Sequence, residues 1–496
     1  MTGITQHLPA LQVVVPLLMV PFVVLLKPRG LAWAAATATS LLAFAIALEL
    51  TMLVFDGEAL SYQMGSWPAP YGIELRVDAL SAILLLAITG ASSIALAGGR
   101  AYFDSILEED RQPFYFAAWL LAVAGLAGIV VSADAFNIFV FMEISSLASY
   151  ILIAGGTDRR ALPAVFKYLI MGTVGATFYL IGIGLIYMMT GTLNLADMEL
   201  RIHDVADQRP ILVAAGFITV GLALKAAIFP LHVWLPNAYT YAPHLTTAFL
   251  AACATKVSLY VLLRFDFFVL QQNLIGHEFQ FAVYLMPLAI LGILIGSAVA
   301  MFETNVKRLL AFSSVAQIGY IMLGASLVTV SGLTAATLHM FNHALAKGGL
   351  FLAVAGFALV AAGLRIENFA GIARRMPWTF AAFIVAGLSL IGVPGTAGFV
   401  SKWYLISASL ELGTPGLLLV AVIIVSSLMA VVYIWRIVET ACFAEPAEVS
   451  EGVRLPPALF AVVWLVALGN IFFGLVPSLP VALSEGAANI LLVHLP

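Results

Sequence analysis

The stretch from Lys225 to Lys256 constrains this chain more than any other. It places two lysines in sequence apolar enough for the interior of a membrane, with Pro230 and Pro236 between them. A lysine at the middle of a bilayer costs at least ~2.5 kcal/mol, so it needs an acidic partner or water. Each proline removes a backbone N–H and frees carbonyls that only protein groups or a water-filled cavity can satisfy. A broken helix beside buried charge indicates a path for ions.

The composition predicts an all-α polytopic membrane protein. Of the 496 residues, 62% are hydrophobic and 10% are charged, against roughly 25% charged in a soluble domain. Because ~20 apolar residues cross a bilayer as a helix, we expect about 14 transmembrane helices. The first span contains Pro16 and Pro21 and has no basic residue before Lys27, so we expect it to be retained rather than cleaved as a signal. The expected spans are residues 8–26, 31–55, 78–99, 114–132, 134–154, 161–189, 210–230, 241–263, 280–302, 306–328, 333–362, 377–408, 416–440 and 456–480.

The basic residues predict the orientation. With both termini outside, 14 of the 22 basic residues fall on the inner side and four on the outer side, as expected for a multi-pass protein of the plasma membrane. The remaining four, Lys225, Lys256, Lys347 and Lys402, lie inside the membrane. The inner set is Lys27, Arg29, Arg100, Arg111, Arg159, Arg160, Lys167, Lys307, Arg308, Arg365, Arg374, Arg375, Arg436 and Arg454, and the outer set is Arg76, Arg201, Arg209 and Arg264.

A carboxylate lies deep in the span 134–154. Glu143 comes nine residues after Asp134, about 13 Å along a helix that rises 1.5 Å per residue. An unpaired ionised glutamate is too costly at that depth, and we expect it to pair with Lys225. Two interpretations fit: a group that takes part in proton transfer, or a structural ion pair or protonated acid bonded to the following serines.

A second polar cluster lies in the span 333–362. His339, His343 and Lys347 are four residues apart and therefore share one face of a helix over ~12 Å. Histidine exchanges protons near neutral pH, and a desolvated lysine can carry them too. The stripe favours a proton relay over a set of satisfied core residues. Lys307 and Arg308, at the start of the span 306–328, are expected to anchor that helix at the inner interface.

Two helices are expected to be broken. The span 210–230 ends at the prolines described above, and Gly392-Val-Pro-Gly-Thr-Ala-Gly398 interrupts the span 377–408 shortly before Lys402. The two helices run in opposite directions by the charge count and are five helices apart, which is typical of inverted repeats. We expect three N-terminal helices in residues 1–112, one five-helix unit in 113–275, its inverted copy in 276–441, and a cytoplasmic loop and C-terminal helix in 442–496.

These motifs resemble the antiporter-like membrane subunits shared by Mrp-type cation/proton antiporters, respiratory complex I and membrane-bound hydrogenases. The resemblance rests on the Phe-Pro-Leu-His-x-Trp-Leu-Pro run after Lys225, on Lys307-Arg-Leu-Leu-Ala-Phe-Ser-Ser, and on the glycine-rich break before Lys402. It implies two half-channels joined by a polar axis at the middle of the membrane. The lysine at position 402 resembles the D-type subunit of the Mrp complexes or other branches of complex I, and the length suits the D-type subunit. The residues that the resemblance implies in proton transfer are Glu143, Lys225, Lys256, His343, Lys347 and Lys402, and the helical spacing adds His339.

The function expected from this resemblance is proton translocation within a multisubunit Na⁺/H⁺ antiporter. The alternative is the proton-pumping subunit of complex I, an NADH:quinone oxidoreductase, or of a hydrogenase; a stand-alone solute permease fits less well because the lysines lie on separate helices. Other membrane subunits, protons, a monovalent cation and the lipid bilayer are the expected partners, without nucleic acid. Cys253 and Cys442 lie in separate helices, so we expect no disulfide and no cysteine-based metal site. We also expect no metal, no cofactor and no catalytic chemistry in this chain, even if it is part of a redox-driven complex.

Overall fold

The computed structural model describes residues 3–26, 30–55, 57–206, 208–270, 284–445 and 455–492. Within these ranges the chain is almost entirely helical, apart from an antiparallel hairpin of β1 (Leu60–Gln63) and β2 (Glu74–Val77) in the loop before the third long helix. Lys27, Arg29 and Arg454, which the charge count used, lie outside the described residues.

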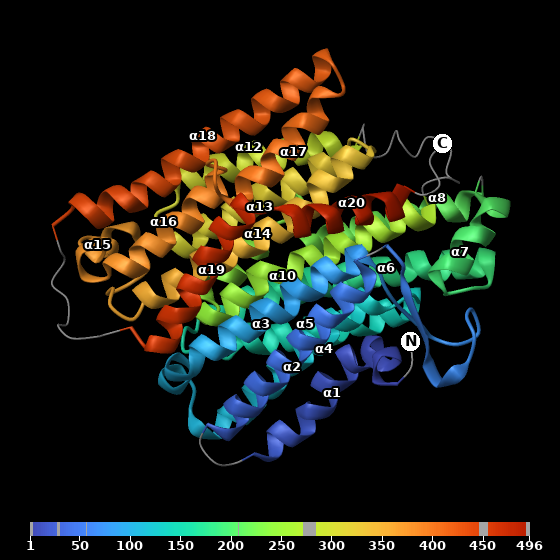
Figure 1. The fold of residues 1–496 in the computed structure, drawn as a ribbon, viewed down its shortest axis with the longest axis horizontal. Coiled ribbons are helices and arrows are strands. Elements are labelled where there is room, and N and C mark those ends of the chain that lie inside the picture. Colours follow the sequence, from blue (N-terminus) through green and yellow to red (C-terminus); the bar gives the residue numbers. More distant parts are fainter. Residues whose placement is uncertain are drawn as a thin grey trace.

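The helices of the first half are α1 (Leu8–Leu25), α2 (Leu31–Val54), α3 (Ala79–Ile106), α4 (Gln112–Val131), α5 (Ala135–Ala154), α6 (Ala161–Thr190), α7 (Leu195–Ile202), α8 (Arg209–Ala226), α9 (Leu235–Tyr241) and α10 (His244–Leu263). Those of the second half are α12 (Met286–Phe302), α13 (Val306–Ala325), α14 (Val330–Phe357), α15 (Ile372–Arg375), α16 (Pro377–Ile391), α17 (Ala397–Leu410), α18 (Thr414–Phe443), α19 (Pro457–Leu475) and α20 (Ser478–Leu492). In Figure 1, α10 and α14 lie near the centre, α1 lies at one edge and α18 at the opposite edge.

The expected membrane architecture is confirmed. Eleven helices in the described part of the chain are long and apolar enough to cross a membrane, and α12, α16 and α20 are shorter apolar helices. Helix α14 has 28 residues but is not among the eleven. It carries the polar stripe of His339, His343 and Lys347. The C-terminal helix α20 was not predicted as a separate element. It packs against α14 and α3 and so covers the centre of the molecule.

The two five-helix units are related at the level of individual hydrogen bonds. At the start of α5, Ala135 N–H donates to Leu193 O at 2.8 Å, and Leu195 N–H donates back to Ala133 O at 2.8 Å. The start of α13 repeats this exchange with the chain that follows α14. There Val306 N–H donates to Leu364 O and Ile366 N–H donates to Thr304 O, both at 2.8 Å. The same pair of bonds therefore closes the helix pair α5–α6 and the helix pair α13–α14.

The two broken helices, α8 and α16, also end in the same way. Helix α8 stops at Ala227, which has a left-handed φ of 57°, and Ile228 N–H reaches back to Ala223 O at 3.0 Å. Helix α16 stops at Gly392, with φ 90°, and Val393 N–H reaches back to a carbonyl of the last turn at 3.0 Å. Both endings have the hydrogen-bond pattern that terminates helices through a left-handed residue. The two broken helices predicted from the sequence are thus present and equivalent.

One residue of the outer set in the charge count has a different environment from the one expected. Arg264 begins the π-helical segment Arg264–Leu270 that continues α10, and it is buried rather than in a loop. Its guanidinium forms an ion pair with Asp78, which caps α3, and donates to Tyr260 Oη at 3.2 Å. Arg264 therefore joins α10 to the start of α3.

Candidate functional site

The first polar contact of the site joins α5 and α8. Lys225 is the penultimate residue of α8, and its Nζ lies 3.3 Å from Glu143 Oε1 and 2.8 Å from Ser146 Oγ. The expected ion pair therefore forms. The lysine side chain is 6% exposed and the glutamate side chain 30% exposed on the isolated chain. Inside a membrane, an exposed ionised carboxylate needs cover from another protein.

A small polar cavity of about 30 Å³ lies beside Lys225. Its walls come from α4, α5, α6, α8 and α10, and Ser145, Ser146, Ser149 and Ser258 supply hydroxyl groups to it. A water needs about 10–15 Å³ of this kind of space and two to four polar partners, so two waters fit. The cavity reaches α10 at Ala254 and Val257, on either side of Lys256 in the sequence. The cavity therefore extends from Lys225 to the part of α10 that carries Lys256.

Lys256 lies at the centre of the molecule. It is 1% exposed, and its ammonium donates to the carbonyl of Ala251 on the same helix. It also interacts electrostatically with His339, His343 and Lys347 on α14. Lys256 therefore faces the polar stripe of the second unit from within the first unit.

The stripe on α14 is held by neighbouring helices at both ends. His339 Nδ1 is 2.8 Å from Ser401 Oγ on α17, and its Nε2 is 2.8 Å from Gln317 Oε1 on α13. Ser401 Oγ also donates to Gly398 O at 3.2 Å. Both ring nitrogens of His339 are thus engaged by neighbouring helices.

His343 is arranged differently. Its ring lies 6.0 Å from that of His339, at an interplanar angle of 9°. Neither ring nitrogen has a hydrogen-bond partner among the described residues, although both are buried. Buried polar atoms are normally satisfied by protein or ordered water. A group with free donor and acceptor positions in the middle of a polar row is suited to pass a proton.

Lys347 and Lys402 bind to different parts of the second five-helix unit. Lys347 Nζ donates to Leu310 O at 2.6 Å and to Ser313 Oγ, both on α13. Lys402 Nζ donates to Ile391 O at 2.8 Å and to Ser427 Oγ at 2.9 Å. The carbonyl is one that the break after α16 frees, so Lys402 occupies the break itself.

The sequence pattern placed Lys307 at the inner interface, and this prediction was wrong. The side chain is 0% exposed, and its Nζ donates to Ala242 O at 2.6 Å, at the junction of α9 and α10. Leu310, whose carbonyl accepts from Lys347, is one helical turn further along α13. A basic residue at the start of a span ordinarily indicates an interface anchor, so no pattern in the chain pointed to this burial.

A polar cavity of about 360 Å³ lies next to the carbonyl that binds Lys307. The count of basic residues places this end of the helices on the inner side of the membrane. The wall of the cavity includes Ala242, whose carbonyl accepts from Lys307, and His244, whose Nδ1 is buried without a partner among the described residues. Asp158 lies at its rim on the α5–α6 loop, outside the spans. A hydrogen bond from Arg160 holds the pKa of Asp158 below its ordinary value. The Asp158 carboxylate therefore stays ionised at the cavity rim, paired with Arg160.

All seven residues predicted from the sequence lie on five helices that are joined by contacts, α5, α8, α10, α14 and α17. Together they form a row of buried cations and histidines with one carboxylate at its start. In the described part of the chain, no group of three His, Cys, Asp or Glu side chains is placed to hold a metal ion.

Comparison with known proteins gives the family. Residues 132–430 match the family model described as NADH:quinone oxidoreductase/Mrp antiporter, TM. The chain is 41% identical to NADH-quinone oxidoreductase subunit N of Desulforudis audaxviator, over 95% of this chain and 96% of that one. It is 28% identical to the D-type subunit of the Na⁺/H⁺ antiporter of Bacillus subtilis, over 87% of each chain.

Two solved structures have the same fold over nearly the whole chain. A chain of the archaeal membrane-bound sulfane sulfur reductase superposes with a TM-score of 0.90 at 32% identity, covering 98% of both chains. A chain of the Mrp complex from Dietzia superposes with a TM-score of 0.88 at 27% identity, covering 99% of this chain and 98% of that one. The protein therefore belongs to the NADH:quinone oxidoreductase/Mrp antiporter membrane family, as an antiporter-like subunit.

Proposed function

We propose that this chain moves protons across the membrane along the row from Glu143 to Lys402, as one subunit of a larger membrane complex. The observation that carries the proposal is the continuity of the row. Lys225, Lys256, His343 and Lys402 are buried in four different helices, yet each is linked to its neighbour by direct interaction, by the stripe on α14 or by a water-sized cavity.

In the proposed cycle, a proton enters the row at the Glu143–Lys225 pair, passes through Lys256 and the stripe on α14, and leaves by way of Lys402. A second entry leads from the polar cavity at His244 to Lys347 by way of Lys307. The charge count supports a cytoplasmic mouth for this cavity. Within the row, a lysine that gains a proton repels the next cation, and this drives the proton onward. While Glu143 is close, it stabilises the charged form of Lys225; when the pair separates, the desolvated ammonium is driven to release its proton.

The coupling of this proton movement to an energy source is a separate question. We favour a redox-driven complex, in which another subunit carries out the electron transfer. The 41% identity to a subunit N and the 0.90 TM-score to a sulfane sulfur reductase chain support this choice. It differs from the sequence-based preference for the D-type subunit of an Mrp complex. Na⁺/H⁺ antiport is the second candidate, supported by the 0.88 TM-score to an Mrp chain.

The two candidates are separated by what copurifies. The tagged chain is extracted from its own host in mild detergent, and the associated subunits are identified by mass spectrometry. We expect peripheral flavin or iron–sulfur subunits, and proton flux into liposomes that follows electron transfer. Small membrane subunits alone, together with proton flux that follows a Na⁺ gradient without any reductant, would overturn the redox assignment in favour of antiport.

A further inference from the structure

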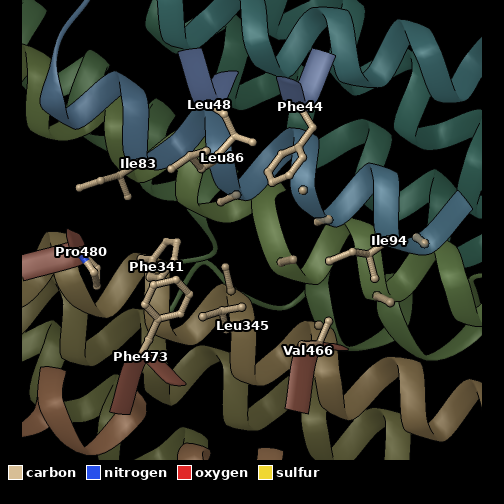
Figure 2. A pocket seen from close by; sticks show the side chains of 18 of the residues that line it. Phe44, Leu48, Ile83, Leu86, Ile94, Phe341, Leu345, Val466, Phe473 and Pro480 are labelled. Atoms are coloured by element: carbon tan, nitrogen blue, oxygen red, sulfur yellow. The ribbon is translucent and has the colours of Figure 1, made fainter. Parts of the chain in front are cut away.

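A wholly apolar groove lies between the N-terminal and C-terminal helices. Its volume is about 230 Å³, and all of the described residues that line it are glycine, proline or hydrocarbon side chains. Figure 2 shows Phe44, Leu48 and Leu86 on one side of the gap, facing Phe341 and Phe473 on the other. The groove therefore has α2 and α3 on one side and α14, α19 and α20 on the other.

The groove exists because small residues line its floor. Helices α3, α10 and α14 meet there through alanines and glycines rather than large side chains. A methyl group added at Gly348 would meet no heavy atom within 4 Å, so open space begins directly at the α14 backbone. The small lining residues are Ala87, Gly90, Ala91, Ala95, Ala248, Ala252, Ala344 and Gly348.

Water is a poor occupant of this space. A buried water needs two to four polar partners, and the lining supplies none. Apolar cavities of ~150 Å³ bind hydrocarbons such as benzene, and this groove is larger. An unfilled void of that size is unfavourable, because its lining atoms would have no packing partners on one side. The groove therefore favours a hydrocarbon occupant.

The rim of the groove faces the bilayer. Leu48 on α2 and Leu479 on α20 line it and are each 39% exposed. Next to it on α2, Leu41 and Leu42 are about half exposed, as expected for a surface bathed in lipid. A transmembrane helix from a partner is about 10–12 Å wide with its side chains and does not fit inside the groove. An acyl chain is narrow, flexible and present at high concentration at the rim.

We propose that one acyl chain of a membrane phospholipid binds in this groove, with its tail against α14 between Phe341 and Gly348. The site lies directly behind the helix that carries His343 and Lys347, so the bound chain supports that helix from the side opposite α13. Binding is independent of which ion or reaction the complex couples to. It is a structural lipid site in the centre of the subunit rather than part of the annular layer.

The test uses the whole complex purified with its native partners. It is reconstituted in vesicles of phosphatidylethanolamine and phosphatidylglycerol that contain a small fraction of phosphatidylglycerol with a photoactivatable acyl chain. After illumination, labelled positions are mapped by peptide mass spectrometry. We expect labelling of residues 341–352, at a yield equal to or above that of the outward-facing Leu41 and Leu42.

Gly348→Leu is the diagnostic variant, because its side chain enters the open space of the groove. We expect labelling of residues 341–352 to fall at least about fivefold relative to Leu41 and Leu42. The matched control is Gly184→Leu on α6, an exposed mid-helix glycine whose added methyl group also meets no atom within 4 Å; it leaves the labelling unchanged.

Phe341→Ala gives a second readout if Gly348→Leu does not assemble. It widens the groove, so we expect it to keep or raise the labelling of Leu345 and Leu352. Absence of labelling in the wild-type complex, or equal labelling in both glycine variants, would overturn the proposal.

Discussion

Glu143 and Ser314 occupy equivalent positions in the two inverted units. Each lies nine residues after the residue that caps its helix, Asp134 for α5 and Asn305 for α13. Only the first unit therefore brings a carboxylate to its broken helix. In the second unit, Lys402 is held instead by the carbonyls of Leu390 and Ile391 and by a serine hydroxyl. The two units share a scaffold but stabilise their lysines in different ways.

The hydroxyl of Ser146 should matter for transport. It accepts from Lys225 at 2.8 Å, and a hydrogen bond to a charged group contributes roughly 1.5–3 kcal/mol. We expect Ser146→Ala to slow proton transfer in liposomes by about tenfold or more, since ~1.4 kcal/mol in a barrier is tenfold in rate. Ser149→Ala on the same helix is the control, because Ser149 lines the same small cavity but bonds to Ser145 O. Wild-type proton transfer in Ser146→Ala would remove Ser146 from the proton path.

Lys307 should behave as part of the path rather than as a surface anchor. Lys307→Met removes a buried ammonium one turn from the carbonyl that binds Lys347, and we expect proton transfer to fall more than about tenfold. The neighbouring Arg308 is 40% exposed and pairs with Glu303, so Arg308→Met should change the rate less than about twofold, as is usual for an exposed ion pair. Similar losses in both variants at equal assembly would restore the anchor interpretation.

The break before Lys402 can be tested at two glycines. Gly392 has φ 90°, and a methyl group there would lie 2.7 Å from Lys402 Cδ; Gly395 has φ 85° but open space around it. A left-handed conformation costs an alanine about 1–2 kcal/mol at either position. Only Gly392→Ala also displaces the lysine, so we expect both variants to lower thermal stability similarly and only this one to abolish most proton transfer. Retained transport in Gly392→Ala would show that the position of Lys402 is not critical.

The ion pair between Asp78 and Arg264 predicts a pH-dependent stability. Asp78, the residue before α3, is buried, and its desolvation raises the pKa of its carboxyl; the charge and hydrogen bond of Arg264 outweigh this effect and hold the pKa below its ordinary value. A lowered folded-state pKa gives stability that is present above the unfolded-state pKa and is lost as the pH falls through the folded-state pKa. We therefore expect the wild-type protein to lose stability in acid.

The substitution Asp78→Asn tests the ion pair between Asp78 and Arg264. It leaves Arg264 buried without its partner, which costs about 3–5 kcal/mol, and it removes the acid-dependent loss that the pair causes. The double substitution Asp78→Asn with Arg264→Met should recover part of the lost stability. Thermal unfolding in detergent, followed from neutral pH down to about pH 3, measures both effects, because the loss begins near the unfolded-state pKa of an aspartate, ~3.9. An unchanged pH profile in Asp78→Asn would contradict this assignment.

The sequence was sufficient for the row of titratable residues, because a charged side chain in an apolar span is conspicuous. Glu143, His339 and Lys347 were predicted for that reason, and Pro230 with the glycine-rich run before Lys402 indicated both breaks. The sequence was not sufficient for groups whose burial depends on distant segments. Lys307 is buried by the α9–α10 junction, and Arg264 is buried by Asp78, which precedes it by 186 residues.

Two other features lacked a periodic signal. The hairpin of β1 and β2 has four residues in each strand, too short for an alternating pattern to stand out in a loop with glycine, proline and aromatic residues. Helix α20 follows α19 after Val476 and Pro477, and the apolar run 456–480 conceals the boundary. The groove beside α14 depends on how six helices pack, which no single stretch of sequence specifies.

Proton transfer along the buried row is tested most directly by altering its first pair in the reconstituted complex. The measurement compares the proton flux of Glu143→Gln and Lys225→Ala with that of the wild type in liposomes, at equal assembly and under the complex's own driving reaction. We predict that both variants lose most of the proton flux, because the row begins at this 3.3 Å contact. Wild-type flux in both variants would contradict the proposed path and would leave the buried row as a structural feature.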